Sequence, residues 1–221
     1  MESSTLDQES FGAETIAARP LLLWGIVAGP FYLAAGLAQA LVREGFDLAR
    51  HPLSLLANGP GGWVQTANFI LTGLMVLAAA VGLRRALGPK SRIATWFLGG
   101  FGISMVLAGL FPADPVDGFP VGTPEGFPTT ISPIGLTHFV VGMVGFLCFA
   151  ISGFGAALAL RRRIPSLAFL SLLSGLVIVL GFFGGAMLPL GILGIWIAVV
   201  AGWIWLATLS LQLRRRARSG D

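Results

Sequence analysis

Two histidines, two acidic residues and a serine are the side chains of this chain that could do chemistry at a metal ion. His51 and His138 are the only histidines, and Asp114 lies between them. Imidazole nitrogen and carboxylate oxygen are typical ligands of zinc sites that keep one position open for water. Zinc lowers the pKa of that water to about 7 and makes it a nucleophile. Ser54, three residues after His51, or Glu125 could then assist hydrolysis.

These metal-ligand candidates stand alone, because no His-x-x-His, Cys-x-x-Cys or Glu-x-x-His pair accompanies them. The same two histidines suggest a second site, in which both imidazoles bind the iron of a haem. Haem ligands of that kind usually lie within membrane spans, whereas His51 is expected in a loop. Zinc or haem therefore remain alternatives to a protein that has no cofactor.

A second group of polar residues recurs at helical spacing within apolar segments. Gln65, Asn68 and Thr72 follow the i, i+3, i+7 pattern of one helix face. One interpretation is that such residues form packing seams with hydrogen bonds between helices. The other is that they line a polar pocket open to the outside, built from Tyr32, Gln39, Gln65, Asn68 and His138.

The composition determines which elements must position these residues. Charged residues make up 11% of the 221 residues, against about 25% in a soluble domain. Hydrophobic residues make up 55% and the mean hydropathy is +0.85, which excludes a soluble domain and a disordered chain. Cys148 is the only cysteine, so a disulfide scaffold is excluded too. We expect an integral membrane protein in contact with lipids; its basic residues cluster beside apolar runs, so no nucleic-acid partner is expected.

Six apolar segments are long enough to cross a bilayer as helices, which takes about 20 residues. The last two form one uncharged stretch that would run for about 75 Å as a single helix, so the chain must fold back within it. Four residues provide the break: Gly184, Gly185, Pro189 and Gly191. The predicted spans are Pro20–Val42, Trp63–Leu83, Ile93–Phe111, Gly135–Leu160, Pro165–Leu188 and Leu190–Leu213.

Lysine and arginine are distributed unevenly over the segments that join these spans. Only Arg43 and Arg50 of the 14 basic residues fall on one side. Because short basic loops stay in the cytoplasm, both termini are expected inside and three hairpins outside. The basic residues of the predicted inner side are Arg19, Arg84, Arg85, Lys90, Arg92, Arg161, Arg162, Arg163, Arg214, Arg215, Arg216 and Arg218.

The charges also divide the chain into regions. Residues 1–18 are acidic and are predicted to form a disordered cytoplasmic tail, residues 19–213 the six-span membrane domain, and residues 214–221 a basic cytoplasmic tail. The acidic leader and the length of the first apolar segment argue against a cleaved signal peptide. The strong preference for arginine over lysine is typical of GC-rich bacterial genomes, so the expected location is a bacterial cytoplasmic membrane.

Two long loops face outward in this arrangement. The first, about residues 43–62, contains His51 and a short apolar stretch, which predicts a small helix lying in the membrane interface with Trp63 at headgroup depth. The second, Pro112–Pro133, holds six of the 13 prolines and the acids Asp114, Asp117 and Glu125. It is longer than a simple connection needs, and we expect either a functional lid or a solvated spacer.

Five stretches of this sequence form a recognisable set: Trp24–Pro30 (WGIVAGP), His51–Leu56 (HPLSLL), Gly61–Gln65 (GGWVQ), Phe111–Pro115 (FPADP) and Gly135–His138 (GLTH). Over about residues 20–212 the chain resembles the bacterial membrane proteins grouped as domain of unknown function 998 (DUF998). The resemblance implies about six membrane spans and no established activity. Because these stretches contain His51, Ser54, Asp114 and His138, the resemblance makes these four residues slightly stronger candidates for a functional site.

We therefore expect a single-domain, all-α bundle of six transmembrane helices with both termini in the cytoplasm. The leading hypothesis is a non-enzymatic protein that binds a lipid or a small apolar ligand at its outward face. The alternative is a metal-dependent membrane hydrolase whose metal ligands are His51, Asp114 and His138. Transport of a neutral or lipid-like solute also stays open, because the spans lack the ionisable residues of an ion relay. The expected ligand contacts are His51, Ser54, Tyr32, Gln65, Asn68, Asp114 and His138.

Overall fold

Long helices account for most of the described chain. The computed structural model describes residues 2–126, 128–184 and 191–219. Two short 3-10 helices, η1 (Leu53–Ala57) and η2 (Pro89–Ser91), lie beside longer elements. The long helices are α1 (Glu2–Val42), α2 (Gly62–Leu87), α3 (Arg92–Leu110), α4 (Pro133–Leu160), α5 (Pro165–Phe182) and α6 (Gly191–Ser219).

Six helices of the described residues are long and apolar enough to cross a membrane, and each overlaps one predicted span. The predicted end of the fifth span, Leu188, and the predicted start of the sixth, Leu190, lie outside the described residues. The expectation of an all-α chain with six such segments is confirmed. The chain also folds back between α5 and α6, as the breakers predict. Of these, Gly184 follows α5 and Gly191 opens α6, whereas Gly185 and Pro189 lie outside the described residues.

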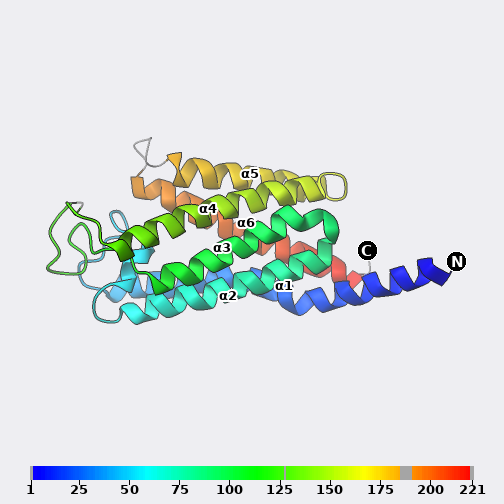
Figure 1. The fold of residues 1–221 in the computed structure, drawn as a ribbon, viewed down its shortest axis with the longest axis horizontal. Coiled ribbons are helices and arrows are strands. Elements are labelled where there is room, and N and C mark those ends of the chain that lie inside the picture. The colour runs from blue at the N-terminus through cyan, green and yellow to red at the C-terminus, as the bar shows by residue number, and fades with distance from the viewer. Residues whose placement is uncertain (1, 127, 185–190, 220–221) are drawn as a thin grey trace.

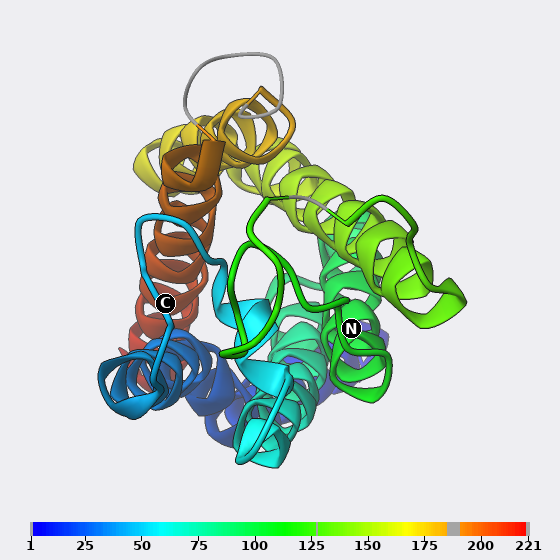
Figure 2. The same cartoon turned by 90° about the vertical axis from the view of Figure 1, so that its left-hand side faces the viewer.

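The six helices form a closed ring in chain order (Figure 2). Each helix packs against its neighbours in the sequence, and α6 closes the ring against α1. The α1–α2 and α3–α4 loops gather at one end, and the start of α1 and the end of α6 lie at the other (Figure 1). We call the first the capped end and the second the terminal end.

Aromatic side chains fill the middle of the ring. Phe101 and Phe149 stack with their centroids 4.0 Å apart, and Trp203 lies against both rings. Tyr32 extends this cluster toward the capped end through Phe69 and Trp203. All five side chains are buried, so this part of the ring is a packed core.

Glycine residues let the helices approach each other closely at several positions. A Cβ atom on Gly29 of α1 would lie 2.6 Å from the Cβ of Trp203 on α6. A Cβ on Gly73 of α2 would lie 2.6 Å from the carbonyl oxygen of Gly102 on α3. Backbones at such distances gain dispersion contacts that lipid cannot replace.

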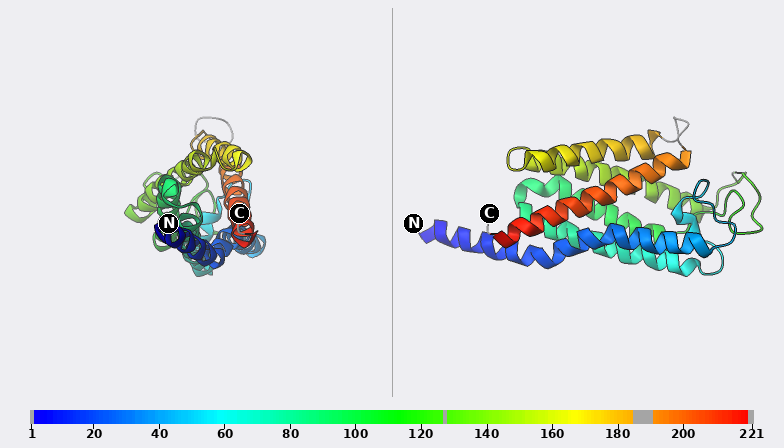
Figure 3. Two further views of the ribbon diagram at one scale, coloured as in Figure 1. Left: turned by 90° about the vertical axis from the view of Figure 1, so that its right-hand side faces the viewer. Right: turned by 180° about the vertical axis from the view of Figure 1, so that it is seen from behind.

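The first helix begins before the predicted membrane domain. α1 starts at Glu2 and extends past the terminal end of the other helices (Figure 3). The division into an acidic tail over residues 1–18, a membrane domain and a basic tail stays a prediction.

Candidate functional site

The capped end is closed by the two long loops, and η1 forms its innermost part (Figure 2). The side chains of Leu53, Leu55 and Leu56 are buried there, and Leu53 packs on Gly36 of α1. The predicted short helix is therefore present. It packs on the ends of the membrane helices instead of lying in the lipid interface, because burying three leucines within the protein removes them from water. Trp63 is 74% exposed.

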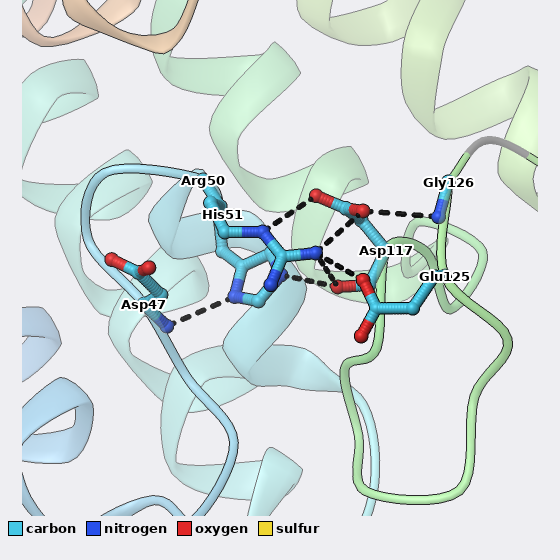
Figure 4. Close-up of polar contacts among 6 residues, drawn as sticks. All are labelled: Asp47, Arg50, His51, Asp117, Glu125 and Gly126. Carbon is cyan, nitrogen blue, oxygen red and sulfur yellow. Dashed lines mark hydrogen bonds and ion pairs between the residues drawn. The ribbon is translucent and has the colours of Figure 1, made fainter.

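His51 joins the first loop to the second (Figure 4). Its Nδ1 accepts a hydrogen bond from the backbone N–H of Asp47 at 3.0 Å. The hydrogen is therefore on Nε2, which donates to the carbonyl oxygen of Asp117 at 2.9 Å. The ring is 1% exposed and lies between Phe46 and Phe119. Both nitrogens are thus occupied, so this imidazole acts as a buried tether between the loops.

Arg50 provides a second, more exposed tether beside His51. Its guanidinium donates to both carboxylate oxygens of Asp117, at 2.7 and 3.1 Å, and also pairs with Glu125. Asp117 further accepts from the backbone N–H of Gly126 at 3.0 Å. The hydrogen bonds from Arg50, and then that from Gly126, hold the pKa of the Asp117 carboxyl below its usual value. The charged carboxylate therefore favours the closed second loop.

The direction of that pKa shift predicts how the cap responds to pH. A carboxyl with a lowered native pKa contributes stability above its ordinary pKa of about 3.9, and the contribution is lost as the pH falls below that value. Hydrogen exchange over residues 116–126, corrected for intrinsic rates, should stay the same between pH 7 and pH 5. R50Q should accelerate exchange at both pH values. A loop that opens between pH 7 and pH 5 would contradict the assignment to Asp117.

Three further hydrogen bonds, from Arg43 and Asn58, hold the cap together. Arg43 donates to the carbonyl oxygens of Leu56, at 3.1 Å, and Asn58, and its guanidinium lies over the ring of Phe119. Asn58 in turn donates to the carbonyl oxygen of Ala113 at 3.0 Å. The two basic residues of the predicted outer side, Arg43 and Arg50, therefore both hold the cap together.

Asp114 supports the start of α4. Its carboxylate accepts from the backbone N–H of Ser132 at 2.8 Å and from the Ser132 hydroxyl at 2.5 Å. The Ser132 hydroxyl oxygen accepts from the backbone N–H of Gly135 and so caps the helix. Both carboxylate oxygens of Asp114 are used in this arrangement, which is a structural one.

His138 ties α4 to the end of α3. Its Nδ1 lies 2.8 Å from the carbonyl oxygen of Phe111 and 3.3 Å from that of Ala108. Carbonyl oxygens only accept, so Nδ1 carries the hydrogen. The ring also packs edge-on against Phe69, with the centroids 6.3 Å apart.

The structure does not bring His51, Asp114 and His138 together. Each bonds to its own local partners, and within residues 2–126, 128–184 and 191–219 no three His, Cys, Asp or Glu side chains could hold a metal ion. His51 has no free nitrogen for a haem iron either. Ser54 is half-buried in η1, and Glu125 pairs with Arg50. The geometry therefore gives no support to the zinc, haem or hydrolase alternatives.

The predicted polar group does converge, directly beneath the cap. Gln39 of α1 donates from Nε2 to Oε1 of Gln65 on α2, at 2.9 Å. Asn68 donates to the same Oε1 at 3.2 Å and to the carbonyl oxygen of Tyr32 at 3.1 Å. Thr72 completes the chain by donating to Oδ1 of Asn68. Three of the five predicted pocket residues, Gln39, Gln65 and Asn68, thus meet through their side chains, and Tyr32 joins them through its backbone carbonyl. His138 packs against Phe69 and has no hydrogen bond to this network.

This network leaves two buried atoms without partners. Both N–H groups of Gln39 are used, because Nε2 also donates to the carbonyl oxygen of Ala35 at 3.0 Å. Turning either amide around would break these bonds or the one from Asn68, so the orientation of both amides is fixed by the network. In the described part of the chain, the buried side-chain atoms without a hydrogen-bond partner are Gln39 Oε1, Gln65 Nε2, Arg19 Nε and Ser210 Oγ. The first two form one acceptor and one donor on bonded neighbours.

A family model described as a protein of unknown function (DUF998) matches residues 26–212. No curated protein and no solved structure matches the chain. The matched range includes both loops of the cap and the residues of the amide network.

Proposed function

Since this chain belongs to the DUF998 family of proteins of unknown function, we propose a function from its own geometry: it binds a small or lipid-like molecule at its outward face. The ligand has an apolar body and a head group, such as an amide or a hydroxyl, that both donates and accepts hydrogen bonds. The observation that carries this proposal is the unpaired acceptor of Gln39 beside the unpaired donor of Gln65.

The unpaired atoms of Gln39 and Gln65 are buried, which makes them energetically costly. Gln39 is 8% exposed and Gln65 is fully buried, so water outside the protein does not satisfy these atoms. An unpaired buried donor or acceptor costs about 1–3 kcal/mol. A head group that pairs with both atoms removes that cost. In this proposal the apolar body lies against the side chains around the network, such as Tyr32 and Phe69. Since the cap closes this site, the ligand enters when the loops or the ends of α1 and α2 move apart.

The same proposal includes the orientation of the molecule in a bacterial cytoplasmic membrane. All basic loops other than the cap lie at the terminal end, together with both termini, and this supports a cytoplasmic location for that end. The capped end then faces outward. Lipids of both membrane leaflets surround the six helices.

Thiol labelling tests the orientation. In a C148S background, T129C places a thiol on the exposed second loop, and K90C places one on the exposed loop between α2 and α3. A membrane-impermeant maleimide applied to spheroplasts should label T129C at once and K90C only after lysis. The reverse pattern would place the capped end inside and contradict the outward site.

Ligand chemistry is tested with three probes of equal chain length. Dodecane, 1-dodecanol and dodecanamide are titrated into the detergent-solubilised full chain, and the bound fraction is measured by native mass spectrometry. The alcohol and the amide should bind about tenfold to a hundredfold more tightly than the alkane, since pairing a buried orphan group is worth about 1–3 kcal/mol. Equal binding of all three probes would contradict a site that recognises a head group.

A further inference from the structure

An apolar groove runs between α4 and α5 on the membrane-facing side of the terminal end. It has a volume of about 390 Å³. We propose that an anionic phospholipid binds there, with an acyl chain in the groove and its phosphate on the arginines of the α4–α5 loop. This site lies at the opposite end of the bundle from the amide network and is independent of the function proposed above.

The shape of the groove follows from residue size along two helices. On α4 it is lined by Phe154, Ala157, Leu158 and Arg161, which follow the i, i+3, i+4, i+7 pattern of one face. This stripe extends for about 10 Å from the loop into the membrane, at 1.5 Å per residue. On α5 the lining residues are Ala168, Phe169 and Leu172. The two alanines form the depression, and the larger, partly exposed side chains form its walls.

Charge distinguishes one occupant from other lipids. Arg161 lines the groove itself, and Arg162 and Arg163 follow in the loop, all three exposed. The sequence has no Asp or Glu between Glu125 and Asp221, so no carboxylate on α4 or α5 competes for these guanidinium groups. Guanidinium groups bind phosphate through paired N–H donors. An acyl chain beside three such groups is the pattern that an anionic phospholipid complements.

A groove on α6 serves as a contrast. It has a similar volume of about 420 Å³ and is lined by apolar residues only, Ala201 among them. Nothing in its lining selects a head group. If a lipid preference is lost on changing the α4–α5 groove but not on changing the α6 groove, that preference depends on the arginines and the α4–α5 groove together.

The test is a lipid titration of the detergent-solubilised full chain, measured by native mass spectrometry. The probes are phosphatidylglycerol and phosphatidylcholine with identical acyl chains. Phosphatidylglycerol should bind at least about tenfold more tightly than phosphatidylcholine. The reason is that each nearby basic residue strengthens the binding of an anionic lipid by about tenfold or less, and three such residues are present. R161Q/R162Q/R163Q should abolish that preference. The matched control R85Q/K90Q/R92Q, which removes three exposed charges from the neighbouring loop, should preserve it.

Groove-filling variants separate a site from general attraction to charge. A157F keeps all three arginines but fills the groove, and it should lower phosphatidylglycerol binding, whereas A201F in the α6 groove should not. L172W fills the same groove from α5 and replaces A157F if the latter fails to fold. Unchanged binding in the groove-filling variant, or an equal loss in the two arginine triple variants, would overturn the proposal.

Discussion

Replacing His51 with alanine should detach the two loops of the capped end from each other and destabilise the protein by about 3 kcal/mol or more. The imidazole is 1% exposed, so its removal leaves a cavity between Phe46 and Phe119. The backbone N–H of Asp47 and the carbonyl oxygen of Asp117 also lose their partner. The expected result is a lower thermal midpoint in detergent and faster proteolysis within residues 112–132.

The matched control for H51A is S54A, which changes a half-buried side chain in η1 only three residues away. S54A should shift stability by about 0.5 kcal/mol or less, because no buried bond depends on it. If H51A unfolds at the same temperature as the wild type and its loops resist protease, then His51 does not hold the cap, and the account of the capped end is wrong.

The second large effect is expected on ligand selectivity, in the double variant Q39L/Q65L. Replacing both members of a buried polar pair by apolar residues of similar size costs little stability, so the main loss in this variant is the bond from Asn68 to Gln65, while Asn68 keeps its bond to the carbonyl oxygen of Tyr32. The same change removes the unpaired acceptor and donor that carry the proposed function. The double variant should fold, and it should lose the preference of about tenfold to a hundredfold for dodecanol and dodecanamide over dodecane.

Two comparisons make this result specific. Q65L alone leaves Gln39 and Asn68 without their shared acceptor, so it should be less stable than the double variant. Q212L changes a glutamine at the terminal end of α6 and should leave the selectivity intact. A double variant that still prefers the polar probes would mean that another part of the protein binds the head group.

The helices could be predicted because each depends on local composition. A run of about 20 apolar residues must be helical in a bilayer, where every backbone N–H and C=O needs an internal partner. The fold-back between α5 and α6 follows from the same reasoning, because no single span needs 50 residues. The ring order could not be predicted from these runs, since it depends on which helix faces meet, as Gly29 and Trp203 do.

The polar site could be predicted in part. The spacing of Gln65, Asn68 and Thr72 places them on one face of α2, and Gln39 follows Tyr32 by seven residues on one face of α1. Whether the two faces meet depends on the rotation of each helix about its axis, which periodicity alone leaves open. The unpaired atoms, Gln39 Oε1 and Gln65 Nε2, can be identified only when all hydrogen bonds of the network are known.

The metal hypothesis shows the limit of arguing from depth in the membrane. His51, Asp114 and His138 all fall at the capped end, as the topology predicts. The depth of a residue in the membrane does not determine its position around the ring of helices. Each of the three side chains forms hydrogen bonds with local partners instead: His51 between the loops, Asp114 at the cap of α4 and His138 at the end of α3. Arg43 and Arg50, counted in the sequence only for topology, bind the cap through partners distant in the chain.

Binding of a head group between the two amides is tested by an experimental density map of the protein purified from its native membrane, at a resolution that shows ordered waters. We expect elongated density whose polar end lies between Gln39 Oε1 and Gln65 Nε2 and whose body continues along apolar side chains. A single water-sized peak joining the two amides, or amides that pair only with each other, would contradict it.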